Sequence, residues 1–248
     1  MADADPVPCI YVLAGTNGAG KSSIGGAMFR QAGAEYFNPD EAARLIQSAN
    51  PGISQAEANS AAWHEGKRLL ERAITGRCNF AFETTLGGNT IPRLLAEALS
   101  LGIEVRIWYA GLSSPELHIA RVRARVEKGG HTIPEADIRR RFEASRLNLI
   151  RLLPKLTELR IHDNSAEFDP DTGHVPAPQL VLHMERGTIV NPRDLLLTPE
   201  WAKPIVAAAL KLATPCPVSG SRPPWVACLP ETSIEVRPVR FRASSNER

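Results

Sequence analysis

The segment 15–22, GTNGAGKS, holds the residues of this 248-residue chain that are best suited to chemistry. It fits the pattern G-x-x-x-x-G-K-[ST], the phosphate-binding loop of proteins that use ATP or GTP. Its glycines let backbone N–H groups turn inward around an anion. Lys21 can reach the β- and γ-phosphates, and the Ser22 hydroxyl can ligate Mg²⁺. The motif therefore predicts an ATP and Mg²⁺ site formed by Gly15, Thr16, Asn17, Gly18, Ala19, Gly20, Lys21, Ser22 and Ser23.

The segments that flank this loop agree with that interpretation. An apolar run at 9–13 is typical of a buried strand, and the run at 23–31 is typical of a helix. The alternative is a glycine-rich turn with an idle lysine. The order strand, loop, helix favours the phosphate loop.

Asp40 is the candidate catalytic base. It follows a short strand-like run at 35–37 and lies in the first turn of a helix that Asn38 caps and Pro39 opens. A carboxylate there can simply favour the helix start. In a doubly wound sheet, however, residues just past a strand face the same crevice as the phosphate loop. Asp40 could there accept the proton of a substrate hydroxyl.

A second strand is predicted at 79–85, where Phe80 and Phe82 alternate with small or polar residues. Glu83 and Thr85 then fall at its carboxyl end, near the same crevice; the alternative is ordinary strand-end polarity. The long helix before it begins with a capping box at 54–57. It carries His64, for which we prefer a surface or packing role.

Two basic helices joined by Gly129-Gly130 resemble a hinged lid over about 115–152. An arginine that closes over a γ-phosphate neutralises the charge that develops during transfer. The alternative is a pair of solvated basic faces. The arginines in these helices are Arg121, Arg123, Arg125, Arg139, Arg140, Arg141, Arg146 and Arg151.

Strands alternating with helices predict an α/β fold. We expect a P-loop NTPase or kinase type of doubly wound, mostly parallel sheet flanked by helices, with a helical basic lid and a C-terminal hairpin and helix. Residues 9–213 are predicted to form this domain. Residues 1–8 are predicted to be a flexible N-terminus, and the proline-rich residues 214–248 a loose tail.

Composition excludes several other classes of protein. The formal charge of +2 argues against a nucleic-acid surface, and no apolar run is long enough for a membrane span. The N-terminus MADADPVP does not resemble a signal peptide. The four scattered cysteines argue against a disulfide framework or a zinc site, so a cytoplasmic protein is expected.

In these motifs and their order the chain resembles the zeta-toxin-like kinases, over roughly residues 9–165. The matching segments are GTNGAGKSS (15–23), FNPDEAARLI (37–46), FAFETTL (80–86) and RVRARVEKGGHTIPEADIRRRFEASRLNL (121–149). The ETTL and GGH-x-x-P segments are the most specific. The resemblance implies ATP-dependent phosphorylation of a small molecule's hydroxyl, in the best-known members that of a UDP-N-acetyl amino sugar, and an antitoxin-type partner.

The resemblance also implies roles for individual residues. Asp40 matches the base, with Asn38 beside it, and Glu83 and Thr85 match residues of the acceptor pocket. Arg125 matches an arginine that binds the γ-phosphate. His131 stands where the family places a second lid arginine, and that role is assigned to Arg140. Glu65 is the nearest candidate for an acidic pocket residue from the long helix.

The alternative function is an NTPase switch or a nucleotide-binding regulatory protein without transfer to a small molecule. A switch or motor needs an apolar strand that ends in an acidic Mg²⁺-binding residue. The strand ending at Glu83 is the clear candidate, and no Asp-Glu pair follows it.

Overall fold

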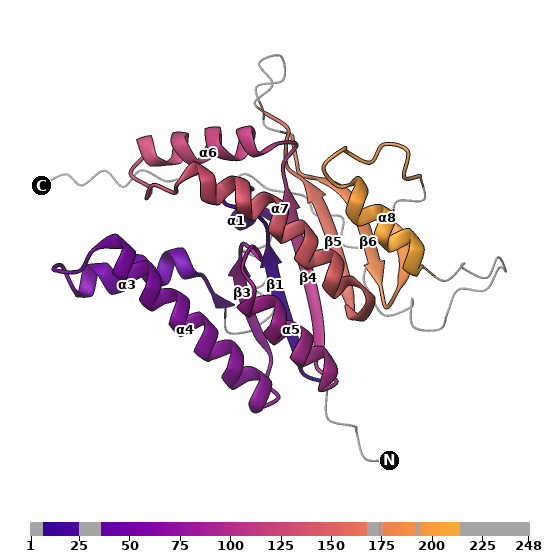
Figure 1. The fold of residues 1–248 in the computed structure, drawn as a ribbon, viewed down its shortest axis with the longest axis horizontal. Helices are drawn as coiled ribbons and strands as arrows, with labels where there is room; N and C mark the ends of the chain where they lie inside the picture. The colour runs from indigo at the N-terminus through magenta and orange to yellow at the C-terminus, as the bar shows by residue number, and fades with distance from the viewer. Residues whose placement is uncertain (1–6, 25–35, 168–173, 175, 192–193, 214–248) are drawn as a thin grey trace, which may run out of the picture. The chain divides into compact units, whose positions relative to one another are not determined.

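The computed structural model describes residues 7–24, 36–167, 174, 176–191 and 194–213, without the side chains of Ser22 and Ser23. The described strands form one seven-stranded sheet in the order β2-β3-β1-β4-β5-β6-β7 (Figure 1). Strands β1 to β5 run parallel, β6 is antiparallel to β5, and β7 is antiparallel to β6. The strands are β1 (Cys9–Ala14), β2 (Tyr36–Phe37), β3 (Phe80–Thr84), β4 (Glu104–Gly111), β5 (Glu158–Asp163), β6 (Gln179–Glu185) and β7 (Thr188–Asn191).

Helices follow the strands as the alternating pattern predicts. They are α1 (Lys21–Ile24), α3 (Pro39–Ala49), α4 (Gln55–Thr75), α5 (Thr90–Ser100), α6 (Pro115–Glu127), α7 (Glu135–Leu152), the 3₁₀ turn η1 (Leu153–Lys155) and α8 (Lys203–Leu212). The Asn38 cap of α3 and the Ser54–Glu57 capping box of α4 both form as predicted. The mostly parallel sheet flanked by helices confirms the predicted fold class.

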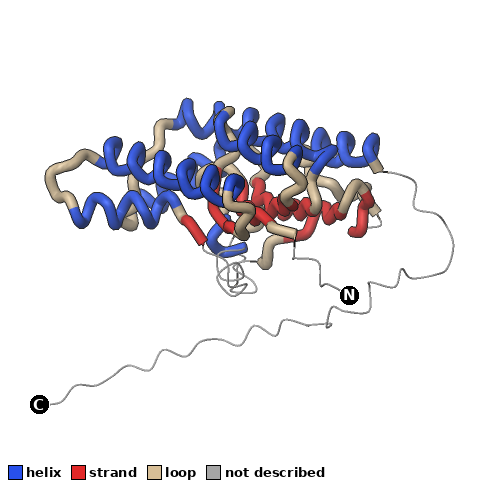
Figure 2. Tube along the Cα trace, turned by 90° about the horizontal axis from the view of Figure 1, so that it is seen from below, coloured by secondary structure: helices blue, strands red, loops and turns tan. Residues whose placement is uncertain are grey.

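The main core lies on one face of this sheet. Alternate residues of the strands, such as Ile10, Val12 and Ile107, pack there against α4, α5, α7 and α8. Figure 2 shows the longer helices along that side of the strands. On the other face, Leu13, Ala81 and Trp108 form a smaller cluster. Residues 25–35, where we predicted most of the first helix, lie outside the described residues.

The parallel strands bring the predicted site segments to one edge of the sheet. In the paired register Ala14 at the end of β1 lies beside Thr84 at the end of β3 and beside Tyr109 of β4. Because parallel strands end at the same edge, the phosphate loop, the start of α3 and the loop after β3 meet there.

Helix α7, the second helix of the predicted lid, is tied to the core. Its buried Asn148 donates to the carbonyls of Leu86 and Gly88, both at 2.9 Å. Its buried Ser145 lies 2.6 Å from the Tyr109 hydroxyl. Phe142, Leu149 and Leu152 of α7 also belong to the main core, whereas Ile119 and Val122 of α6 cluster with Ile133 and with Ile138 of α7. Helix α7 is thus part of the core framework, and the lid stays a prediction.

The predicted tail at 214–248 and most of the predicted N-terminus lie outside the described residues. None of the helices that the structure describes combines the length and the apolar character needed to cross a membrane.

Candidate active site

The loop between β1 and α1 is shaped by glycines that no other residue could replace without strain. Gly15 has φ +142°, and a Cβ atom there would lie 2.2 Å from the carbonyl oxygen of Ala110. Gly18 has φ +83°, and a Cβ atom would lie 2.7 Å from the carbonyl oxygen of His118. The glycines therefore let the loop pack against the backbone of β4 and α6 with positive φ angles, the kind of backbone that can turn N–H groups toward the triphosphate that the motif predicts.

Lys21 is held at the loop. Its Nζ donates to the carbonyl oxygen of Gly15 at 3.0 Å. Burial lowers the pKa of Lys21, while the charges of Glu83 and Asp40 oppose that shift. The lysine therefore lies within electrostatic reach of both candidate carboxylates.

Asp40 faces α6 as well as the loop. Its Oδ2 lies 3.5 Å from Nη1 of Arg125, so the candidate base and the candidate phosphate-binding arginine form an ion pair. Both side chains are partly exposed, which makes such a pair weak and easy to open.

Arg125 is loosely held compared with the other arginines of α6 and α7. Its Nη2 donates to the His131 carbonyl at 3.4 Å, and its buried Nε has no hydrogen-bond partner among the described residues. A buried guanidinium donor without a partner is costly. An arriving oxyanion would supply that partner.

Glu83 connects β3 to the segment that carries the base. It is 8% exposed, and its Oε1 accepts hydrogen bonds from the Tyr36 hydroxyl and, at 3.2 Å, from Nδ2 of Asn38. The Oδ1 of Asn38 in turn accepts from the backbone N–H groups of Asp40, at 2.9 Å, and Glu41, at 3.3 Å. Asn38 therefore couples a buried carboxylate to the backbone of Asp40.

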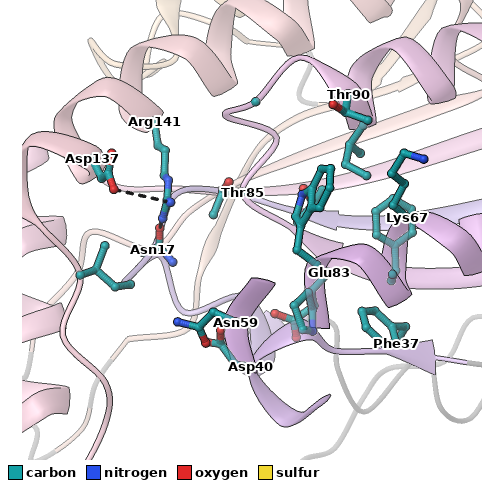
Figure 3. Close-up of a pocket in the computed structure, with 18 of the residues that line it drawn as sticks. Asn17, Phe37, Asp40, Asn59, Lys67, Glu83, Thr85, Thr90, Asp137 and Arg141 are labelled. Carbon is teal, nitrogen blue, oxygen red and sulfur yellow. Dashed lines mark hydrogen bonds and ion pairs between the residues drawn. The ribbon is translucent and has the colours of Figure 1, made fainter. Parts of the chain in front are cut away.

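A cavity of about 390 Å³ opens between these groups (Figure 3). Asn17 of the phosphate loop and Arg141 of α7 line one part of it, and Asp40, Glu83 and Thr85 line another. Of the residues predicted for the acceptor, Glu83 and Thr85 thus line the cavity. Asn38 is not among the lining residues and holds its neighbours instead.

Two residues predicted for the site, Arg140 and Glu65, are not among those that line the cavity. Arg140 pairs with Asp137 at 3.0 Å on the exposed side of α7, and the next residue, Arg141, enters the cavity. Glu65 pairs with Arg68 on the surface of α4 at 2.7 Å. Trp63 and Lys67 line the cavity, and Glu65 lies two residues from each of them. Two residues are about half a turn of an α-helix, so Glu65 projects from a different side of α4.

Arg141 ties α7 to the phosphate loop. Its Nη1 donates to Oδ1 of Asn17 at 2.8 Å, and Asp137 lies 3.9 Å from its Nη2. Burial lowers the pKa of Arg141. A Cβ atom at Gly87 would lie 2.8 Å from Cγ of Arg141, so the loop after β3 needs glycine here to admit this side chain.

His118 is a second contact between the lid region and the phosphate loop. This residue of α6 is 1% exposed, and its Nδ1 lies 2.8 Å from the carbonyl oxygen of Asn17. Burial lowers the pKa of His118 to about 4. The ring is therefore neutral at pH 7, and the Nδ1–H tautomer is the one that can donate to that carbonyl.

His64, by contrast, lies away from the cavity. It is exposed on α4, and its Nδ1 lies 2.8 Å from the carbonyl oxygen of Ser60 in its own helix. This placement agrees with the surface role that we preferred for it.

The sheet and the loop define a P-loop protein of the kinase type. The Zeta toxin family model matches residues 2–169, and the chain belongs to this family. An uncharacterized protein of Haemophilus influenzae is 33% identical over 129 residues, which cover 52% of this chain and 88% of that protein.

Among solved structures, this chain is similar to one chain in the crystal structure of AvrRxo1-ORF1:AvrRxo1-ORF2 with sulphate ions. The TM-score is 0.58 at 17% identity, over 87% of this chain and 66% of that one. The same complex with ATP also has a TM-score of 0.58 at 17% identity, over 88% and 67% of the two chains. This chain thus spans about two thirds of that chain's length, and at this identity the likeness shows the fold alone.

Proposed function

We propose that the protein is an ATP-dependent kinase that transfers the γ-phosphoryl group to a hydroxyl of a small molecule. The observation that supports this most is the Asp40 carboxylate, which lines one cavity together with Asn17 of the phosphate loop and lies 3.5 Å from Arg125. A base, a phosphate loop and an arginine around one cavity are the parts that phosphoryl transfer needs.

In the proposed reaction the acceptor oxygen forms a bond to the γ-phosphorus while the bond to the β-phosphate oxygen breaks. The electron pair of that bond leaves with ADP, and Asp40 takes the proton of the acceptor hydroxyl. The backbone of residues 15–23 and Lys21 hold the triphosphate. Mg²⁺, with Ser22 as its ligand, would neutralise phosphate charge.

Arg125 and Arg141 stabilise the transferring group in this proposal. Arg125 has a buried Nε without a partner in the described part of the chain, and Arg141 already contacts Asn17 of the loop. Arg141 therefore takes the role that we had assigned to Arg140. Positive charge next to the γ-phosphate offsets the negative charge that develops on its oxygens.

The experiment incubates the protein, γ-labelled ATP and Mg²⁺ with sugars, nucleosides, small alcohols and a UDP-N-acetyl amino sugar, which is the acceptor that the family resemblance implies. Products are identified by mass. A phosphorylated acceptor made by the wild type and not by Lys21→Ala supports the proposal. ATP hydrolysis without any phosphorylated acceptor would favour an NTPase switch instead.

The proposal also includes a protein partner and a cellular compartment for the reaction. The AvrRxo1 structures contain a second protein, ORF2. By analogy, an antitoxin-type protein could bind this chain, and co-purification from cells that express both would test it. We place the reaction in the cytoplasm, where ATP is abundant.

A further inference from the structure

Helix α4 supplies one wall of the cavity. Asn59, Trp63 and Lys67 follow one another at intervals of four residues and all line it, and Figure 3 shows Asn59 and Lys67 on this wall. Side chains four apart share a face of a helix. Gly66 lets α4 approach β2, because a Cβ atom there would lie 2.6 Å from the ring of Phe37.

Trp63 is the feature of this wall that most suggests a ligand. Its side chain is 43% exposed although it is large and mostly apolar. The His64 ring packs edge-on against it at 4.9 Å. An aromatic ring on the wall of a polar cavity provides a flat surface on which a ring-shaped ligand can pack.

The polar part of the cavity is dominated by uncharged side chains. Amides and hydroxyls can both donate and accept hydrogen bonds, so they suit ligand hydroxyls, which do the same. Those lining the cavity include Asn17, Asn59, Asn89, Thr85, Thr90 and Thr132. Helix α5 begins on the same wall without a side-chain cap, and its first backbone amides add donors for a ligand oxygen.

The cations that line the described cavity are already engaged by protein groups. Lys67 lies 2.7 Å from Oε1 of Glu71, and Arg141 donates to Asn17. Asp40, Glu83 and Asp137 add three carboxylates. A phosphate or carboxylate on the acceptor would be repelled by these carboxylates. Of the two lining cations, Arg141 is the one proposed to bind the γ-phosphate, which leaves Lys67 beside Glu71.

We propose that the acceptor is an uncharged, hydroxyl-bearing ring compound, such as a sugar or nucleoside without phosphate, that packs against Trp63. This inference rests on the proposed kinase function and narrows its acceptor. It differs from the UDP-linked acceptor of the resemblance, whose diphosphate carries negative charge.

The test asks two separate questions, namely whether the protein transfers phosphate to any acceptor and whether that acceptor is charged. Small molecules extracted from cells are divided on an anion exchanger into an unbound neutral fraction and a bound anionic fraction. Each fraction is incubated with γ-labelled ATP, Mg²⁺ and the protein, with Lys21→Ala as the blank. A labelled product from the neutral fraction is expected.

Label transferred only to compounds of the anionic fraction would overturn this inference and leave the kinase proposal standing. Label transferred to neither fraction would overturn the kinase proposal and, with it, this inference. The two failures are therefore distinguishable.

Variants of Trp63 then test whether its ring binds the acceptor, with the acceptor that is identified in the neutral fraction. Trp63→Ala should raise the acceptor KM about ten-fold, with the KM for ATP unchanged, because the packing surface is lost. Trp63→Phe keeps a ring and should restore most of the affinity. Arg68→Ala, on another side of α4 and paired with Glu65, is the matched control. An unchanged acceptor KM in Trp63→Ala would refute the packing role.

The dependence of the acceptor KM on salt tests the charge of the acceptor in a second way. At saturating ATP, the KM of an uncharged acceptor should stay constant as NaCl rises, because salt screens interactions between charges only. A KM that rises steeply with salt would point to an anionic acceptor and contradict the inference.

Discussion

Arg125 and Asp40 form an ion pair, with 3.5 Å between Nη1 and Oδ2, and so join α6 to the start of α3. The pair brings together the proposed base and an arginine proposed to bind the γ-phosphate. A γ-phosphate carries more negative charge than a carboxylate and would compete for the guanidinium. Nucleotide binding would then release Asp40 toward the acceptor hydroxyl.

The first prediction concerns Asp40. Asp40→Asn should lower kcat by about 100-fold or more. An amide cannot take the proton of the acceptor hydroxyl, and the loss of a general base typically lowers the rate by that factor. The dissociation constant for ATP should change little, since the phosphate loop is intact. Steady-state transfer rates and ATP titration measure the two quantities.

Glu41→Gln is the control for Asp40→Asn, because Glu41 belongs to the same helical turn and does not line the cavity. It should transfer phosphate at nearly the wild-type rate. Wild-type turnover by Asp40→Asn would show that another group is the base.

The second prediction separates two neighbouring arginines. Arg141→Ala removes the 2.8 Å bond to Asn17 and a positive charge from the cavity. It should lower kcat/KM for ATP about 100-fold, the usual loss of a group that stabilises charge in the transition state. The rate at subsaturating ATP measures this ratio.

Arg140→Ala is the matched control, since it removes the same charge from the adjacent position, where the side chain is exposed and paired with Asp137. A change of less than about two-fold is expected, because exposed pairs contribute little. Equal losses in the two variants would contradict the distinction.

Much of the fold follows from local sequence signals. The glycine loop, the Asn38 cap and the capping box at Ser54 are each defined by a few adjacent residues, and each forms as predicted. The alternation of Phe80 and Phe82 likewise identifies β3. Such signals are readable because the groups involved are neighbours in the chain.

Contacts between distant segments were harder to predict. Arg140 does not line the cavity and its neighbour Arg141 does, and the core stripe Ile138, Phe142 and Leu149 indicates which face of α7 is buried. Arg141 follows Ile138 by three residues and therefore lies close to that face. For Tyr36, no local pattern predicts that its hydroxyl reaches Glu83, because the pairing of β2 with β3 decides it.

The third prediction tests whether Glu83 positions the base or binds the acceptor. Glu83→Gln keeps an oxygen that can accept from Tyr36 and Asn38, so a positioning role predicts a small loss of kcat and an unchanged acceptor KM. An acceptor-binding role for the charge predicts a higher acceptor KM. Kinetics with varied acceptor at saturating ATP distinguish the two.

Tyr36→Phe is the companion variant. It removes the hydrogen bond from the Tyr36 hydroxyl to Oε1 of Glu83 and leaves the ring in place. Loosening the Asn38 cap should lower kcat several-fold while ATP and acceptor KM stay within about two-fold, since small misplacement of a base costs rate. A raised acceptor KM with unchanged kcat would argue that Tyr36 contributes to binding instead.

The last prediction concerns stability and pH. Burial lowers the pKa of His118 from its ordinary value of 6.5 to about 4. Between these values the unfolded chain binds more protons than the folded one, so stability falls as the pH decreases. From pH 7 to pH 5 this single group should cost about 2 kcal/mol.

Urea unfolding of the wild type and His118→Gln at both pH values measures this difference. Glutamine does not titrate, and its amide can still donate to the Asn17 carbonyl, so the variant should lose about 2 kcal/mol less between pH 7 and pH 5. The half-buried His162, whose pKa burial also lowers to about 4, is present in both proteins and cancels in the comparison. An identical pH dependence in the two proteins would mean that His118 titrates normally, and that its ring does not hold the phosphate loop in the neutral form.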